Sequence, residues 1–172
     1  MNLMLHIYDC FQHKEIIIKN IDKANRILLA QIQKDSTLSL EKLSAVCNLS
    51  IPSVQRRLKQ LRKLNIVDRE VAILNPSTLG QKMSFIINVE LERQGVQQLN
   101  EFRFMVSKDD RVQQCYFVTG QGDFTLICSS RDIEDFEDLA QSLFITNLNV
   151  KWFRTSFVME RTKVSLEVPL NI

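Results

Sequence analysis

Residues 50–63 bring amide, guanidinium and ammonium side chains together on one short segment, and these are the groups that bind nucleic acid. Arg pairs with guanine and Gln with adenine through two hydrogen bonds, whereas Lys and Arg also bind phosphate. The predicted readers of base edges are Ser53, Gln55, Arg56 and Gln60. The predicted phosphate contacts, which supply affinity more than sequence choice, are Lys59, Arg62 and Lys63. The segment therefore predicts contact with duplex DNA.

Two further residues of this segment have two readings each. Ser50 is expected to cap a helix first, with a phosphate contact as a second role. Arg57 lies next to the apolar side of the segment, so it either contacts phosphate or forms a structural salt bridge.

Two helices joined by a tight turn are expected to position these side chains. In the first, Leu40, Leu43 and Cys47 recur at helical spacing, and Asn48 follows where the chain must turn. In the second, an apolar stripe leaves a basic surface without any acidic residue. The stripe consists of Val54, Leu58 and Leu61. An ordinary surface helix would mix Glu with Lys, so a helix-turn-helix that enters the DNA major groove is the favoured interpretation.

The charge of the chain is divided unevenly. Residues 21–75 carry ten Lys and Arg against five Asp and Glu, whereas residues 76–172 carry ten against thirteen. Only the first part is therefore expected to meet a polyanion. No stretch approaches the ~20 apolar residues of a membrane span, and residues 1–20 lack the features of a signal peptide. A cytoplasmic protein without membrane contact is expected.

Neither a metal site nor a catalytic site is predicted. The four cysteines lie far apart without a C-x-x-C pair, which indicates free thiols in a reducing cytosol. His6 and His13, with Asp9 and Cys10, match no familiar ligand spacing. The sequence contains no combination of Ser, His and Asp or of Cys and His typical of a catalytic site, and no glycine-rich phosphate-binding loop before a helix. We therefore expect a protein that is not an enzyme and that needs no cofactor.

The second half of the sequence alternates between strand and helix patterns. The predicted order is β-α-β-β-α-β, with strands at 85–91, 112–118, 124–128 and 150–160 and helices at 96–106 and 132–144. This α+β, ferredoxin-like order places both helices on one face of an antiparallel sheet. The other face is left partly apolar, so dimerisation across it is expected.

These patterns divide the chain into five segments. The predicted division is an extension at 1–20, a helix-turn-helix domain at 21–65 that opens with a helix at 21–34, a linker or hinge at 66–80 with extended pieces, a dimerisation domain at 81–165 and a tail at 166–172. Between the second and third strands of the dimerisation domain lies a glycine turn whose backbone N–H groups could hold a carboxylate, with an acidic side chain to receive an ammonium group. Its residues are Thr119, Gly120, Gln121, Gly122 and Asp123. The alternative is a tight turn in which Asp123 makes only a local hydrogen bond.

From residue 21 to about residue 163 the chain resembles the Lrp/AsnC (leucine-responsive and asparagine-responsive) family of transcription regulators. The resemblance depends on many weak motifs in one order. They are Asp22-x-x-Asn25-x-x-Leu28-Leu29-x-x-Ile32 with Gln33-Lys34-Asp35, Leu43-Ser44, Leu49-Ser50, Ser53-Val54, Arg57-Leu58, Leu61, Ala72, Leu74-Asn75-Pro76, Leu79-Gly80, Val118-Thr119-Gly120, Asp123-Phe124 and Val158-Met159-Glu160.

The departures from the family pattern are few. Asn25 stands where the family usually has Asp, and Asn48 and Asn65 stand where it usually has Gly. Gln121-Gly122 differs from many relatives in the effector loop.

The resemblance implies a DNA-binding regulator with a winged helix-turn-helix head and a ligand-responsive domain similar to the ACT fold. It implies a homodimer or a ring of dimers, a pseudo-palindromic operator in double-stranded DNA, and an amino acid as the usual effector, bound near residues 119–123. The rival interpretation is an RNA-binding or metabolite-sensing module without operator specificity, because the strand order is shared with the RNA recognition motif. That rival needs exposed aromatic residues on the central strands, and Phe117 is the strongest candidate.

Overall fold

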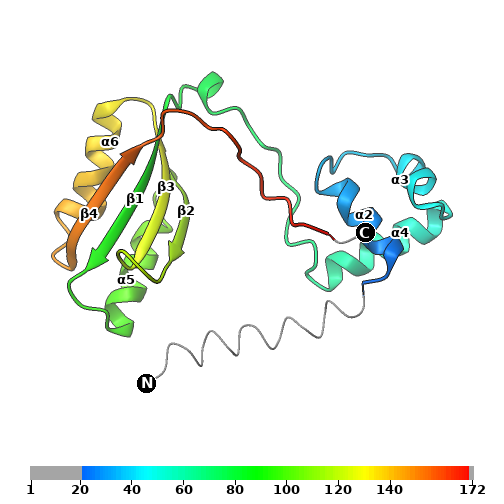
Figure 1. Ribbon diagram of the computed structural model, residues 1–172, viewed down its shortest axis with the longest axis horizontal. Helices are drawn as coiled ribbons and strands as arrows, with labels where there is room; N and C mark the ends of the chain where they lie inside the picture. Colours follow the sequence, from blue (N-terminus) through cyan, green and yellow to red (C-terminus); the bar gives the residue numbers. More distant parts are fainter. Residues whose placement is uncertain (1–20, 171–172) are drawn as a thin grey trace. The chain divides into compact units, whose positions relative to one another are not determined.

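The computed structural model describes residues 21–170, which divide into two compact units (Figure 1). One unit consists of residues up to 72 together with the C-terminal stretch from 165, and the other of residues 73–164. The C-terminal tail, which the sequence analysis kept apart, belongs to the first unit. There Gln33 pairs with Val168 through two hydrogen bonds, of 3.2 and 3.0 Å, between its side-chain amide and the Val168 backbone.

The first unit contains three helices around a small core. They are α2 (Lys23–Ile32), α3 (Leu40–Cys47) and α4 (Ile51–Lys63). Each presents apolar side chains at helical spacing toward the other two, as the sequence pattern predicts. The core residues are Leu28, Leu43, Cys47, Val54 and Leu58.

Local side-chain chemistry sets the ends of these helices. The Asp22 carboxylate accepts the Asn25 N–H at 2.7 Å, and the Ser39 hydroxyl accepts the Lys42 N–H at 3.3 Å. Asn48 turns the chain with φ 52°, in the left-handed region that Asn tolerates better than most residues. Ser50 stands at the N-cap of α4, but its side chain makes no capping hydrogen bond. Proline in the first turn lacks an N–H, which removes one of the usual donors to a cap.

The segment after α4 differs from expectation in one respect. Asn65 follows the helix with φ 53°, a left-handed conformation that suits the Gly usual at this position in the family pattern, but residues 66–76 form no strand. A short 3₁₀ helix, η1 (Ser77–Leu79), follows. Among residues 21–170, all strands lie in the second unit.

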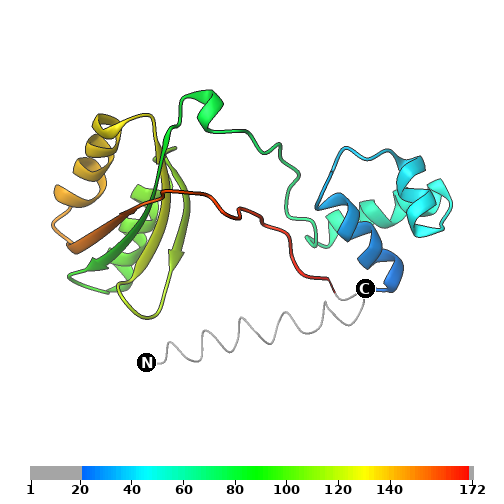
Figure 2. The same cartoon turned by 45° about the horizontal axis from the view of Figure 1, so that its top comes forward.

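The second unit is a four-stranded antiparallel sheet with strand order β2-β3-β1-β4. Helices α5 and α6 cover the same face (Figures 1 and 2), and the element order is the predicted β-α-β-β-α-β. The bounds are β1 (Met83–Leu91), α5 (Val96–Val106), β2 (Val112–Phe117), β3 (Phe124–Ser130), α6 (Ile133–Ala140), η2 (Gln141–Ile145) and β4 (Val150–Phe157).

Several bounds differ from the predicted ones. Strand β1 begins two residues earlier, at Met83, β2 ends one residue earlier, at Phe117, and β3 continues two residues further, to Ser130. The last helix changes to a π-helical turn, η2, after Ala140, although its apolar side chains continue into the core. Strand β4 ends at Phe157 instead of residue 160, because its neighbour β1 begins at Met83. The last backbone hydrogen bond between them is donated by the Val158 N–H to Ser84 O, at 2.9 Å.

The core of this unit lies between the sheet and the two helices. Side chains alternate along β1, so that Phe85, Ile87 and Val89 are buried while Ile86 and Asn88 lie on the open face. No helix among residues 21–170 is long and apolar enough to cross a bilayer.

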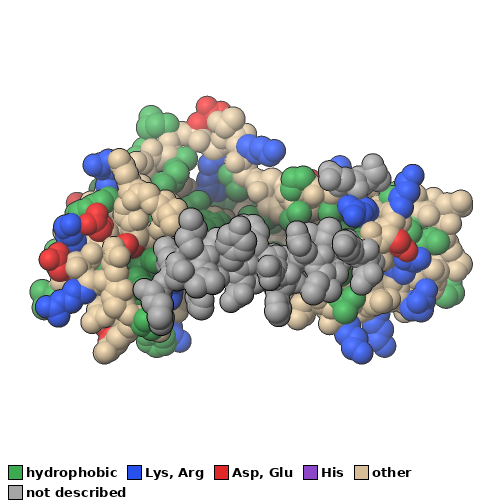
Figure 3. Space-filling view, turned by 60° about the horizontal axis from the view of Figure 1, so that its bottom comes forward, with side chains coloured by type: hydrophobic (Ala, Val, Ile, Leu, Met, Phe, Trp, Pro, Cys, Tyr) green, Lys and Arg blue, Asp and Glu red, His purple; other side chains and the backbone are tan. Residues whose placement is uncertain are grey.

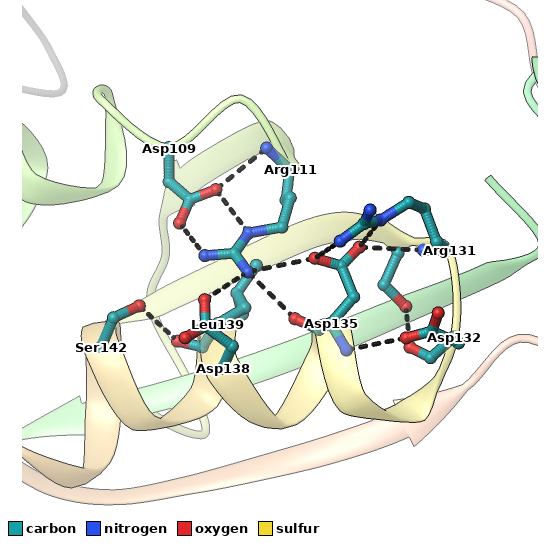
Figure 4. A network of polar contacts seen from close by, with 9 residues as sticks. Asp109, Arg111, Arg131, Asp132, Asp135, Asp138, Leu139 and Ser142 are labelled. Atoms are coloured by element: carbon teal, nitrogen blue, oxygen red, sulfur yellow. Dashed lines mark hydrogen bonds and ion pairs between the residues drawn. The ribbon is translucent and has the colours of Figure 1, made fainter. Parts of the chain in front are cut away.

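Arg111 anchors α6 to the start of β2 (Figure 4). Its guanidinium donates to Asp109 at 2.7 and 2.9 Å, to the Asp135 backbone oxygen at 3.0 Å and to Asp138 at 2.9 Å. Hydrogen bonds from Arg111 hold the pKa of Asp109 below its usual value. Asp135 also accepts the Arg131 backbone N–H, at 3.0 Å, and that bond lowers the pKa of its carboxyl group.

Candidate functional site

Helix α4 presents the predicted DNA-contacting side chains to solvent. Its buried residues are those of the apolar stripe, Val54, Leu58 and Leu61. The exposed residues are Gln55, Arg56, Lys59, Gln60, Arg62 and Lys63. Ser53 is half-buried and Ser50 is exposed at the N-terminal end of the helix. The space-filling view shows Lys and Arg side chains standing out from the helical unit (Figure 3).

The cations of this surface are mostly uncompensated. Among the described residues Arg56, Lys59 and Lys63 make no ion pair, whereas Arg62 pairs with Glu70 at 2.8 Å. The Arg62–Glu70 pair is largely exposed, so it contributes little to stability and can open toward another anion. The surface therefore retains the positive charge that a phosphate backbone requires.

Arg57 is the exception, because it is paired within the protein. Its guanidinium donates to Asp22 at 2.6 Å and to Asn25 at 3.0 Å, and the side chain is 21% exposed. Hydrogen bonding from the Asn25 backbone and from Arg57 holds the pKa of Asp22 below its usual value. Arg57 therefore forms the structural salt bridge, which joins α4 to the first turn of α2.

The loop between β2 and β3 is a tight turn tied to the end of β1. Asp123 N–H donates to Val89 O at 2.7 Å, and Val118 N–H donates to Asp123 O at 2.9 Å. Gly120 and Gly122 have φ of +126° and +86°. A Cβ at Gly122 would lie 2.8 Å from Val89 O and 3.5 Å from the Trp152 ring, so only glycine fits there. The N–H groups of residues 119–122 donate no hydrogen bond to any described residue.

Asp123 is the buried member of this loop, with 7% of its surface exposed. Its Oδ2 accepts the Leu91 N–H at 2.8 Å, and its Oδ1 accepts the Gln94 side-chain amide at 2.9 Å. The turn is tight, but these side-chain hydrogen bonds of Asp123 are not the local ones that the sequence analysis offered as an alternative, because they join it to residues about 30 positions earlier. Gln94 and Trp152 were not singled out from the sequence, because both lie about 30 residues from the loop and no local pattern connects them to it.

The strands on either side of the loop also line a hollow of about 350 Å³ between α5 and β2. Arg103 borders it, with its guanidinium 5.2 Å from the centre of the Phe117 ring and 5.9 Å from that of Phe124. Burial raises the pKa of the Cys115 thiol, which also lines the hollow. A thiol with a raised pKa is a poor nucleophile at neutral pH.

Phe117 does not serve the rival RNA-binding interpretation. It lies on the helix-covered side of the sheet, where the centre of its ring is 5.2 Å from that of Phe124 and the Arg103 guanidinium lies over the ring. On the open face the central strands β1 and β3 present instead the aliphatic and polar residues Ile86, Asn88, Glu90, Thr125 and Ile127. Stacking of bases on the central strands, which that interpretation requires, has no aromatic platform here.

No three His, Cys, Asp or Glu residues among the described positions 21–170 are grouped closely enough to hold a metal ion. The group formed by His6, Asp9, Cys10 and His13 lies outside the described residues.

Comparison with known proteins agrees with both units. A winged helix-turn-helix DNA-binding family model matches residues 21–68, and the Lrp/AsnC ligand-binding domain matches residues 84–168. An uncharacterized HTH-type transcriptional regulator of Sinorhizobium fredii is 35% identical over 88% of this chain and 90% of its own length. The chain belongs to the Lrp/AsnC family. It is a DNA-binding regulator of the Lrp/AsnC type, and the RNA-binding alternative is not favoured.

Other family members agree in length and fold. The leucine-responsive regulatory protein of Escherichia coli is 27% identical over 86% of this chain and 90% of its own length. A transcriptional regulator of Neisseria meningitidis, crystallised as a complex with L-methionine, is 28% identical with a TM-score of 0.84. That match covers 88% of this chain and 98% of the Neisseria chain. Helix α4 is thus the second helix of the helix-turn-helix.

Proposed function

We propose that the exposed side of α4 reads an operator in duplex DNA. The run of exposed amide and uncompensated cationic side chains along this helix carries the proposal. The residues that reach base edges are Ser53, Gln55, Arg56 and Gln60. Arg56 and the two glutamines can each form the paired hydrogen bonds that distinguish one base from the others.

Phosphate contacts come from the flanks of the same helix. Lys59 and Lys63 are free for this role, and Arg62 joins them when phosphate replaces Glu70 as its partner. The Ser50 hydroxyl, which makes no capping bond, donates to phosphate at the N-terminal end. Arg57 acts as a brace that holds α4 against α2 rather than as a phosphate ligand.

Two copies of the chain meet across the open face of the sheet, as a homodimer or a higher assembly of dimers. Ile86 and Ile127 provide apolar surface at its centre, and Tyr116 and Trp152 flank them on the outer strands. A two-fold axis then presents two α4 helices to a pseudo-palindromic site whose halves lie one helical turn, or a multiple of it, apart.

The loop at residues 119–123 binds an amino acid effector. The free N–H groups of Thr119, Gly120, Gln121 and Gly122 are suited to a carboxylate, and Asp123 supplies a negative charge for an ammonium group. The Neisseria relative crystallised with L-methionine supports an amino acid as the ligand class. Binding shifts the balance between dimer geometries or between assemblies by its differential affinity for them.

The chain acts by binding and not by catalysis, in the cytoplasm where its DNA target lies. The free-thiol cysteines of the described residues are consistent with this compartment.

The DNA-binding proposal is tested with Arg56→Ala, measured by gel shift at fixed salt on an operator selected from random duplexes. Loss of one bidentate base contact reduces specific affinity by about 10–100-fold and relaxes the preference at one base pair. Lys23→Ala is the matched control, because it removes the same charge from an exposed position on α2. Equal operator affinity in wild type and Arg56→Ala would contradict the assignment of α4 as the reading helix.

A further inference from the structure

The carboxylate of Asp123 has no cation in ion-pair contact within the described part of the chain. It is buried, it accepts two hydrogen bonds from uncharged donors, and among residues 21–170 it makes no ion pair. Lys151, whose charge interacts with that of Asp123, forms its ion pair with Glu90 instead, at 2.6 Å. A buried carboxylate is stabilised more by a charged donor than by a neutral one, so this site favours a cation.

One of the two donors is replaceable and the other is not. Leu91 N–H belongs to the end of β1 and cannot leave without opening the strand. Gln94 donates through a side chain that is otherwise exposed, from the short connection between β1 and α5. Backbone hydrogen bonds from Glu92 to Asn149 O at 2.8 Å and from Arg93 to Asn149 Oδ1 at 3.2 Å hold that connection in place. The Gln94 side chain can therefore swing out while the backbone stays.

We propose that the Gln94 amide occupies the place of the effector's ammonium group and leaves when the effector binds. The inference depends on the proposed effector role of the 119–123 loop. The ammonium donates to Oδ1 of Asp123 in place of the amide, while Oδ2 keeps the Leu91 N–H. Gln94 is then the residue that sets affinity for the amino group, because every amino compound must displace it, whereas a deaminated analogue gains nothing from doing so.

The test uses Gln94→Met in the full-length chain, because Met keeps the length of the side chain but offers no donor. L-Methionine, L-leucine and their 2-oxo acid analogues are titrated calorimetrically and by the fluorescence of Trp152, the only tryptophan, which lies beside Gly122. Both amino acids are expected to bind the variant about tenfold more tightly than wild type, which corresponds to about 1.4 kcal/mol. Affinity for the 2-oxo acids is expected to stay unchanged.

Gln97→Met is the matched control, because the Gln97 side chain bonds, within residues 21–170, only to Glu101 on the surface of α5, at 2.9 Å. It should leave all affinities unchanged. In an Asp123→Asn background the advantage of Gln94→Met should disappear, since the carboxylate that distinguishes ammonium from amide is gone. Heat-unfolding curves recorded for each variant show whether an affinity change comes from loss of the folded loop.

The outcomes separate this inference from the proposed function. If wild type binds amino acids and Gln94→Met binds them no more tightly, the inference is wrong while the effector loop stands. The inference also fails if the variant gains equally for amino acids and 2-oxo acids, because the amino group is then not what displaces Gln94. If neither protein binds any of these ligands, the effector proposal fails and the inference fails with it.

Discussion

Gly122→Ala is expected to destabilise the second unit far more than the same change at Gly80. The two glycines have nearly the same backbone conformation, with φ of +86° and +85°. An added Cβ meets nothing within 4 Å at Gly80, but at Gly122 it lies 2.8 Å from Val89 O. The pair therefore separates the cost of a left-handed conformation from the cost of a close backbone approach.

The conformational cost is common to both variants. Placing Ala in the left-handed region costs about 1–2 kcal/mol, partly offset by about 0.4–1 kcal/mol from the reduced freedom of the unfolded chain. Gly80→Ala should thus lower the free energy of unfolding by about 0–1.6 kcal/mol.

The additional cost at Gly122 comes from the contact with Val89 O. This oxygen also accepts the Asp123 N–H at 2.7 Å, so it cannot move away without weakening that hydrogen bond. Loss of the bond costs about 1 kcal/mol and leaves a buried donor unpaired, so we expect a further destabilisation of about 2 kcal/mol. For a unit of this size that corresponds to a melting temperature about 8–16 °C lower than that of Gly80→Ala.

Heat unfolding followed by Trp152 fluorescence measures this difference, because Trp152 lies in β4 and its ring lies 3.5 Å from the position of the added Cβ. Melting temperatures that agree within about 2 °C between the two variants would refute the reasoning, since they would mean that no backbone group limits the space at Gly122.

Two further predictions concern Arg57 and Arg111, the arginines that form ion pairs between segments distant in the sequence. Arg57→Met should lower the free energy of local opening of α2 and α4 by about 1 kcal/mol, a figure kept small because Asp22 is half-exposed, and hydrogen exchange of their amides should speed up accordingly. The salt dependence of DNA binding should stay unchanged. A reduced salt slope, which we expect instead for Lys59→Met, would show that Arg57 does contact phosphate. Arg111→Met should cost about 2 kcal/mol in urea unfolding at pH 7, because among the described residues it leaves Asp109 and Asp138 without an ion-pair partner. The pKa of Asp109 is lower in the folded protein than in the unfolded chain, where it is about 3.9. The ion pair with Arg111 therefore contributes fully to the free energy of unfolding above about pH 3.9, and this contribution is lost as pH falls through the pKa of the folded protein. The cost of Arg111→Met should thus be smaller at pH 3 than at pH 7. A cost that stays constant from pH 7 to pH 3 would contradict this reasoning. Arg131→Met is the control: Arg131 is exposed and also pairs with Asp135, and its replacement should change the free energy of unfolding little.

The sequence was most informative where structure depends on neighbours along the chain. Asp22, Ser39 and Asn48 end or begin helices through bonds to residues a few positions away, and Asn48 stands at the turn that the pattern predicted. The helix at 96–106 was predicted to the residue, because its apolar positions repeat at 3.6 and face one sheet. The exposed basic side of α4 was likewise readable, because three buried aliphatic residues determine which side remains.

Tertiary structure decided the contacts between segments that are distant in the sequence. Arg57 meets Asp22 across 35 positions, and Asp123 meets Leu91 and Gln94 across about 30. Ser50 has the residue type of a cap but makes no capping bond. Residues 66–74 have the composition of a strand but lack a partner strand in the described chain. Local patterns limit which conformations a segment can adopt. They do not determine which group pairs with a carboxylate, a guanidinium or a strand edge, because such pairs form only when the sheet and helices bring distant groups within hydrogen-bond distance.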